Sequence, residues 1–185
     1  MTPPPAVDVH AHFYPESFLR VIQEEGAAFG LRLDRSNPKG PVLVGAGAPG
    51  PPRDATYWDR DRRGRAMDRA GVAVHALSLT APMTHWARGE TARRAARAVN
   101  DAMAEAHHAY PERFVGCATL PMQEPALAQA ELERVAILPG IRAVYMGTNV
   151  NGRELSDPAF QPLFARCEAL GLPVLLHPLT VIGHQ

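Results

Sequence analysis

The sequence predicts an α/β fold of the (β/α)8-barrel type, in which helices cover a parallel sheet. Two observations support this prediction. Strand-like and helix-like segments alternate along the whole chain, a pattern typical of parallel sheets. In addition, histidines occupy the ends of the first and the fifth predicted strands, where barrel enzymes place their active sites. Since no repeat or linker divides the pattern, we expect a single domain over residues 1–185.

Five segments have the composition of β-strands: short apolar or β-branched runs, bounded by glycine, proline or polar residues. They are residues 7–12, 72–79, 114–120, 141–146 and 173–177. Four helical regions are expected between successive strands, with an additional short helix directly after the first strand. The expected helices are residues 16–25, 59–70, 90–109, 124–138 and 158–170. Gly26, Gly71 and Gly171 stand directly after three of them, as helix-ending glycines often do.

Two parts of the chain do not fit a regular pattern. Residues 30–56 are rich in glycine and proline, so we expect a long irregular loop there. The chain also ends eight residues after the fifth strand, with no helix to cover that strand. An open doubly wound sheet of five strands is one explanation. A barrel that lacks its last three β/α units explains the ending better.

Composition limits the classes of partner. The formal net charge is zero, so the chain has no basic field to attract nucleic acid or anionic lipid. A small-molecule substrate fits this balance better. Two cysteines are too few for a disulfide framework, and no run approaches the roughly 20 apolar residues of a membrane span. With no signal-peptide pattern at the N-terminus, we expect a cytoplasmic protein.

The candidate metal ligands are His10, His12 and His177. Because strand side chains alternate between faces, His10 and His12 should project to the same side, together with Asp8. His177 ends the fifth strand, which lies opposite the first strand in an eight-stranded barrel. Three neutral imidazole ligands are a known coordination set of catalytic zinc. An H-x-H pair alone is a weak signal, and chance surface histidines are the alternative explanation.

The other histidines have simpler explanations. We expect His75, inside the second strand, to be packed and hydrogen-bonded, and His107 and His108 to end a long helix. His85 and Trp86 follow the second strand and are candidates for lining a substrate pocket. His184, near the end of the chain, cannot be assigned.

Several ordered motifs occur along the chain. They are Val-Asp-Val-His-Ala-His-Phe-Tyr-Pro from residue 7, Met-Asp-Arg-Ala-Gly-Val from residue 67, Tyr-Pro-Glu-Arg-Phe-Val-Gly from residue 110, Leu-Pro-Met-Gln from residue 120, and Leu-His-Pro from residue 176. Together they resemble the amidohydrolase-related decarboxylases, of the amidohydrolase 2 family. The likeness covers nearly the whole chain except residues 30–56.

This resemblance implies a distorted barrel that holds one divalent ion, usually zinc, bound by His10, His12 and His177. It also implies an acid/base histidine after the sixth strand and an aspartate after the eighth; neither position is present among these 185 residues. The family decarboxylase uses an arginine before a Trp-Asp pair, here Trp58-Asp59. Arg53 is the nearest candidate, although its spacing departs from the family pattern, and the alternative is a solvated loop arginine.

The implied activity is decarboxylation of a small carboxylated substrate, such as a carboxymuconate semialdehyde, without an organic cofactor. A metal-dependent hydrolase of an ester, lactone or amide is the main alternative, since both reactions share this fold and metal site. A truncated and inactive chain is the second alternative. A metal-dependent nuclease is more distant, because the sequence has no basic stripe. The resemblance also implies that the protein can form a homodimer.

Overall fold

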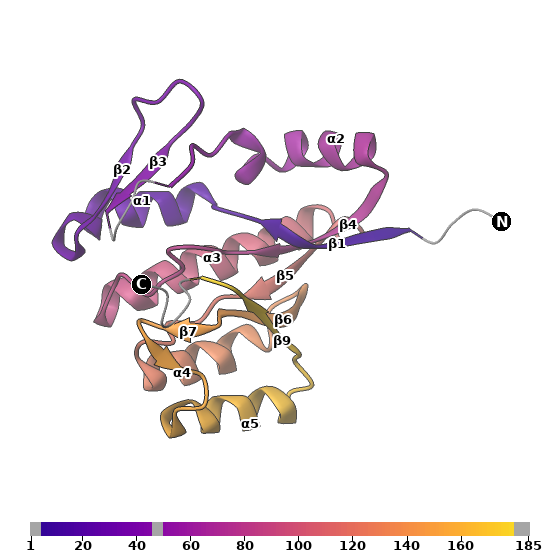
Figure 1. Cartoon of the computed structure of the whole chain (residues 1–185). Helices are drawn as coiled ribbons and strands as arrows, with labels where there is room; N and C mark the ends of the chain where they lie inside the picture. Colours follow the sequence, from indigo (N-terminus) through magenta and orange to yellow (C-terminus); the bar gives the residue numbers. More distant parts are fainter. Residues whose placement is uncertain (1–4, 46–49, 180–185) are drawn as a thin grey trace.

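A five-stranded parallel sheet forms the centre of the computed structural model, which describes residues 5–45 and 50–179 (Figure 1). The strand order is β1-β4-β5-β6-β9, and every neighbouring pair is parallel. The bounds are β1 Ala6–His12, β4 Val72–Ser78, β5 Phe114–Ala118, β6 Ile141–Gly147 and β9 Val174–His177. All five strands predicted from the sequence are present, with ends that differ by one or two residues.

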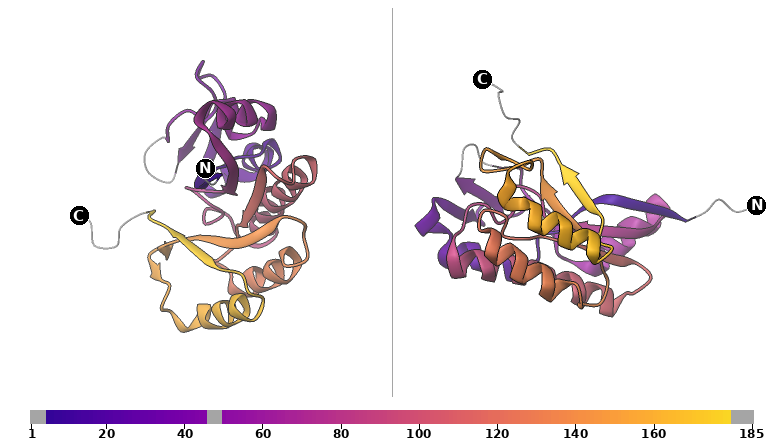
Figure 2. Two further views of the ribbon diagram at one scale, coloured as in Figure 1. Left: turned by 90° about the vertical axis from the view of Figure 1, so that its right-hand side faces the viewer. Right: turned by 90° about the horizontal axis from the view of Figure 1, so that it is seen from below.

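The sheet is curved but not closed, and the helices lie on its outer side (Figure 2). Their bounds are α1 Glu16–Glu25, α2 Arg60–Ala70, α3 Gly89–Ala109, α4 Pro125–Val135 and α5 Gln161–Ala169, with 3-10 turns η1 Gly26–Phe29, η2 Ala55–Tyr57 and η3 Pro158–Phe160. The expected helix over 158–170 therefore divides into η3 and α5. None of the described helices is long and apolar enough to cross a membrane.

The curved sheet is part of a (β/α)8 barrel, as the sequence predicted. β1 and β9 are its two edges, and each has one neighbouring strand in the sheet. Large apolar side chains are exposed on both edges: Val7 is 56% and Val9 59% exposed on β1, and Leu176 is 55% exposed on β9. Each edge strand therefore presents apolar surface and unpaired backbone groups.

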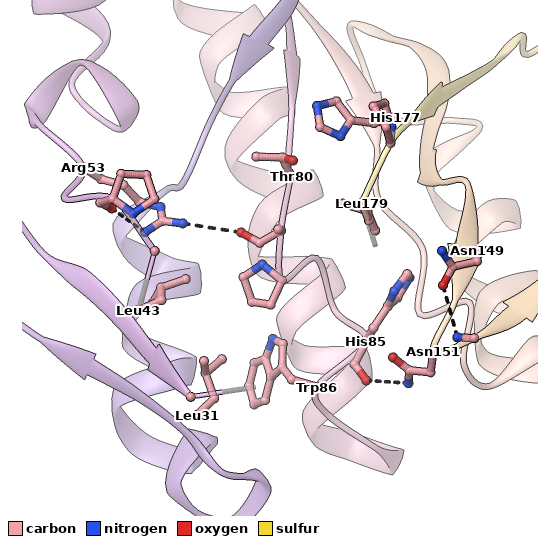
Figure 3. A pocket seen from close by; sticks show the side chains of 17 residues that line it. Leu31, Leu43, Arg53, Thr80, His85, Trp86, Asn149, Asn151, His177 and Leu179 are labelled. Atoms are coloured by element: carbon pink, nitrogen blue, oxygen red, sulfur yellow. Dashed lines mark hydrogen bonds between the residues drawn. The ribbon is translucent and has the colours of Figure 1, made fainter. Parts of the chain in front are cut away.

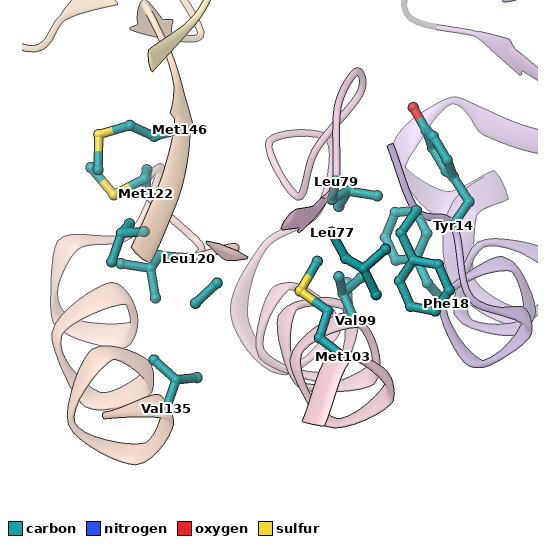
Figure 4. Packing of buried hydrophobic residues seen from close by; sticks show 14 of the residues in the cluster. Tyr14, Phe18, Leu77, Leu79, Val99, Met103, Leu120, Met122, Val135 and Met146 are labelled. Atoms are coloured by element: carbon teal, nitrogen blue, oxygen red, sulfur yellow. The ribbon is translucent and has the colours of Figure 1, made fainter. Parts of the chain in front are cut away.

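The main core fills the space between the sheet and its helices (Figure 4). The helix pattern explains it: α3 turns its small and apolar residues inward, including Ala95, Val99 and Met103, each fully buried. A smaller cluster on the inner face of the sheet contains Ala76, Cys117, Ala143 and Tyr145. This inner cluster forms the floor beneath the strand ends that carry the histidines.

The expectation of a wholly irregular loop over residues 30–56 is wrong. β2 Leu31–Asp34 and β3 Val42–Gly45 form an antiparallel hairpin within it. The strands are only four residues long, and the glycine and proline around them conceal their alternation. A second small hairpin, β7 Asn149–Val150 with β8 Arg153–Glu154, was also not predicted.

The predicted side of Asp8 is also wrong. Asp8 pairs with His75 and Ala11 with Leu77, so β1 has one more residue than β4 over this stretch. This β-bulge breaks the alternation between Asp8 and His10. Asp8 therefore shares the outer face with His75, whose Nε2 lies 3.6 Å from Asp8 Oδ2, while His12 pairs with Ser78 on the inner face.

Candidate metal centre and adjoining cavity

The structure brings His10, His12 and His177 together at the carboxyl ends of β1 and β9. One ligand nitrogen from each ring can be chosen so that all three lie within 4.8 Å of one another. The ring centroids are 4.5 Å apart for His10 and His12, 5.0 Å for His10 and His177, and 5.1 Å for His12 and His177. Two opposite edges of the sheet thus meet at one point, although they share no backbone pairing.

The separation of the ring nitrogens fits a shared cation. Nε2 of His10 lies 3.3 Å from Nε2 of His177. Two nitrogens bonded to one tetrahedral zinc ion at about 2.0–2.1 Å stand roughly 3.3–3.4 Å apart. Nδ1 of His12 lies 3.3 Å from Ser78 Oγ, a contact that can fix the tautomer and leave Nε2 available to the cluster. The residues present therefore fit a divalent ion.

The electrostatic surroundings favour the neutral forms of His12 and His177. Burial, with smaller contributions from His10, His177 and Arg63, lowers the pKa of His12 to about 4. Burial, followed by the nearby His10 ring, also lowers the pKa of His177. A neutral imidazole retains the lone pair that binds a metal.

A cavity of about 730 Å³ adjoins the histidine cluster and contains His177 in its wall (Figure 3). Its walls come from the β2–β3 hairpin, the segment around Arg53, and the loops that follow β4, β6 and β9. The active sites of parallel barrels lie at this end of the strands. The residues that line it are Leu31, Leu43, Gly45, Gly50, Pro51, Arg53, Thr80, Ala81, Pro82, His85, Trp86, Asn149, Asn151, Gly152, His177, Pro178 and Leu179.

Arg53 lines this cavity and is only 6% exposed, which rules out a solvated loop arginine. Its guanidinium lies 4.2 Å from the centre of the Tyr14 ring. Nη2 donates to Tyr14 Oη at 3.2 Å and to the Ala81 carbonyl at 3.4 Å, and Nη1 donates to the Pro51 carbonyl at 3.2 Å. The guanidinium has five N–H donors, so these three contacts leave two unassigned: one on Nη1 or Nη2, and the Nε–H, which is buried with no partner among the described residues.

His85 and Trp86, the sequence's candidates for a substrate pocket, also line this cavity. Burial lowers the pKa of His85 to about 4, so this ring is neutral at neutral pH. Its Nε2 atom is buried with no hydrogen-bond partner among the described residues. Trp86 Nε1 donates to the Met83 carbonyl at 3.1 Å, which presents the ring as an apolar wall.

Sequence reasoning missed several residues of the cavity. Thr80 lies in the loop after β4, and Asn149 and Asn151 lie in the short β7–β8 hairpin after β6; neither segment has a periodicity that could identify them. Their position directly after two predicted strands is the signal that could have found them. Asn149 Oδ1 accepts from the Gly152 backbone N–H at 3.1 Å, and Asn151 Nδ2 donates to the His85 carbonyl at 3.0 Å.

The remaining histidines behave largely as predicted. His75 lies inside β4, and its Nδ1 is 3.3 Å from Arg63 Nη1. Nδ1 of His107 lies 2.8 Å from the Phe114 carbonyl, near the end of α3. His184 is outside the described residues.

Comparison with known proteins decides the family. A family model described as amidohydrolase matches residues 7–185. The chain belongs to the amidohydrolase family. This assignment rests on nearly the whole chain rather than on the H-x-H pair alone.

The curated relatives of this amidohydrolase are named as decarboxylases. The chain is 31% identical over 178 residues to 2-amino-3-carboxymuconate-6-semialdehyde decarboxylase of Dictyostelium discoideum, with 96% of this chain and 50% of that protein covered. It is 38% identical over 130 residues to gamma-resorcylate decarboxylase of Polaromonas sp., with 64% and 39% covered. The chain thus spans about half the length of the curated relatives it matches, or less.

Solved structures also resemble this chain over nearly its whole length. The apo IDCase of Metarhizium anisopliae matches with a TM-score of 0.81 and 25% identity, over 95% of this chain and 50% of that chain. A dihydroxybenzoic acid decarboxylase from Polaromonas sp., solved with manganese and 2-nitroresorcinol, matches with a TM-score of 0.72 and 27% identity, over 98% and 51%. This family therefore includes metal-dependent decarboxylases, and about half the length of these solved chains has the fold described above.

Proposed function

We propose that this chain provides the metal-binding half of the active site of a decarboxylase that acts on a small carboxylated substrate. The observation that carries the proposal is the convergence of His10, His12 and His177 beside a cavity that also contains a buried arginine. The names of the curated relatives support decarboxylation over hydrolysis. A carboxymuconate semialdehyde or a dihydroxybenzoate is the substrate class these relatives suggest.

His10, His12 and His177 would hold one divalent ion, which we propose to be zinc. Three neutral nitrogen ligands suit zinc, and the manganese bound in the similar Polaromonas structure supports a divalent ion in proteins of this fold. When bound, the ion would act as a Lewis acid on a substrate oxygen. Ser78, next to His12 Nδ1, would hold that ring in the tautomer that keeps Nε2 free.

Arg53 would receive the substrate carboxylate or a neighbouring anionic oxygen. Three oxygen acceptors and the Tyr14 ring hold its guanidinium in place, so little side-chain entropy remains to be lost on binding. The apolar walls from Leu31, Leu43 and Trp86 exclude water around this cation. A carboxylate held there loses its hydration while the carbon beside it is oriented for loss of CO2.

His85 would bind a polar group of the substrate from the opposite wall. A neutral imidazole offers one N–H donor and one acceptor lone pair, and its Nε2 has no partner among the described residues. Decarboxylation leaves an electron pair on carbon, and a proton must replace CO2. The acid/base histidine that the family resemblance implies belongs to the part of the relatives that this chain does not span.

An assay of both reactions tests the proposal. We expect a version extended by three further β/α units to release CO2 from 2-amino-3-carboxymuconate-6-semialdehyde or 2,6-dihydroxybenzoate. It should hydrolyse no ester or lactone at a comparable rate. The 185-residue chain should show no substantial turnover. Arg53→Met in the extended version should lower kcat/KM for decarboxylation by about 100-fold, because a charge-assisted contact to the carboxylate is lost.

Arg35→Met is the matched control. Arg35 is an exposed arginine in the same segment, residues 30–56, and it pairs with Glu16 at the surface. Its activity should equal that of the unchanged protein. Hydrolysis without CO2 release would contradict the proposed reaction. Full activity of Arg53→Met would remove that residue from the site.

The cytoplasmic location and a homodimer remain predictions from the sequence and the family resemblance. A single domain over residues 1–185 is likewise a proposal, supported by the continuous alternation of strands and helices.

A further inference from the structure

The β-bulge in β1 lies directly beside the candidate metal ligands. The additional residue falls between Asp8 and Ala11, the stretch that contains His10. Bulges bend a strand and turn a side chain in a new direction. Here the bulge permits Asp8 to face outward while His10 and His12 both reach His177, so the geometry of the ligand pair depends on what holds the bulge.

Three side chains on the outer face hold it. Arg63, on α2, is 6% exposed and donates through Nη2 to the main-chain carbonyl of His12 at 2.5 Å. Its Nη1 lies 3.3 Å from His75 Nδ1. Asp8 Oδ1 accepts from the His10 backbone N–H at 2.8 Å, and its Oδ2 lies 3.6 Å from His75 Nε2.

The direction of these contacts is fixed by the chemistry of arginine. A guanidinium has five N–H donors and no acceptor, so His75 Nδ1 must accept from Arg63. The proton of a neutral His75 ring is then on Nε2, where it faces the Asp8 carboxylate. One connected chain thus runs from Arg63 through His75 and Asp8 to the His10 backbone, while Arg63 separately anchors His12.

Fold stability alone is a weak reason for a cation at this position. Arg63 is buried, and its Nε has no partner among the described residues. A buried charge with incomplete compensation contributes little to stability, and an apolar residue of similar length is often tolerated there. Its two side-chain hydrogen bonds lead to His75 and to the His12 carbonyl, and its guanidinium also lies 5.9 Å from the ring of Phe13, the residue after His12.

We propose that Arg63, acting with His75 and Asp8, is a positioning residue for His10 and His12. It holds the bulged end of β1 so that both rings point at the same place as His177. This inference rests on the proposed metal site, and it assigns Arg63 no contact with metal or substrate. Partners that orient metal ligands in this indirect way commonly change metal affinity about 10- to 100-fold when removed.

Titration of the metal-free 185-residue chain with Co²⁺ tests the inference, because the visible absorption of Co²⁺ reports the geometry of its ligands. We expect Arg63→Met to retain the circular dichroism and cooperative unfolding of the unchanged chain. It should bind Co²⁺ about 10- to 100-fold more weakly and show an altered absorption spectrum. Arg63→Lys, which can still reach the His12 carbonyl, should recover part of the affinity.

Arg65→Met is the matched control, since Arg65 is an exposed residue of the same helix, and it should bind Co²⁺ as the unchanged chain does. Asp8→Ala gives a second test should Arg63→Met fail to fold, because the Asp8 side chain is 39% exposed at the start of a strand. It too should weaken binding. Unchanged affinity and spectrum in the folded variants would overturn the positioning role alone. No Co²⁺ binding by the unchanged chain would overturn the metal site itself.

Discussion

Single residues decide how the strand ends are held, and Asn100 on α3 is the clearest example outside the site. Its side chain is fully buried and bonds to both backbone groups of Thr119, directly after β5. Its Nδ2 also donates to Glu131 Oε1 at 2.8 Å, and Arg134 makes a two-pronged contact with the same carboxylate. This network ties α3 and α4 to the end of β5.

Asn100→Ala should therefore lower the free energy of unfolding by about 3 kcal/mol, because it leaves the buried backbone N–H and carbonyl of Thr119 without this partner and removes one donor to Glu131. Urea denaturation measures the change. Glu105→Ala, on the exposed side of the same helix, should change it by no more than about 0.5 kcal/mol. Equal effects of the two substitutions would show that the network is not a stabilising one.

At this scale the sequence identified His10, His12, His177, Arg53, His85 and Trp86, and the structure places all six at the histidine cluster or its cavity. His10, His12 and His177 were predictable because they lie at the ends of the first and fifth predicted strands, which are opposite each other in a barrel. Asp8 was placed on the wrong face, because strict alternation contains no information about a bulge. Thr80 and the two asparagines were missed because loop residues have no period.

Among the elements, the β2–β3 hairpin is the part that the sequence concealed, and it forms a wall of the cavity. Its packing against Arg53 depends on Gly40, which has a φ of +122°. A Cβ atom there would lie 1.9 Å from the Arg53 carbonyl oxygen. The Arg53 backbone N–H in turn donates to the Pro41 carbonyl at 3.0 Å, so the hairpin turn and the arginine are held together.

Gly40→Ala should destabilise the chain by more than about 1 kcal/mol, since alanine tolerates neither the backbone angle nor the contact. Gly64→Ala offers a control of opposite sign. Gly64 lies inside α2 with open space where its Cβ would be, so alanine should stabilise the helix by about 0.5–1 kcal/mol. Thermal unfolding of both variants distinguishes them, and a neutral Gly40→Ala would contradict the close packing of the hairpin.

For the whole molecule, the order of strands and helices was predictable because each element has its own hydrophobic period. The curvature of the sheet was expected only as part of the barrel prediction, because it follows from strand twist and side-chain packing across many elements and no single segment encodes it. Curvature is what allows β1 and β9, the two edges, to bring their histidines together. The proposed metal site thus depends on the folded half-barrel rather than on any one motif.

Metal content tests whether His10, His12 and His177 form one metal site. After incubation with Zn²⁺ and dialysis, elemental analysis of the 185-residue chain should find about one ion per chain. His10→Ala and His177→Ala, on opposite edges of the sheet, should each lose nearly all of it, because two ligands hold zinc far more weakly than three. His108→Ala, an exposed histidine at the end of α3, should retain full occupancy. A chain without bound zinc, or stoichiometric zinc in either His10→Ala or His177→Ala, would contradict a metal site formed by these three histidines.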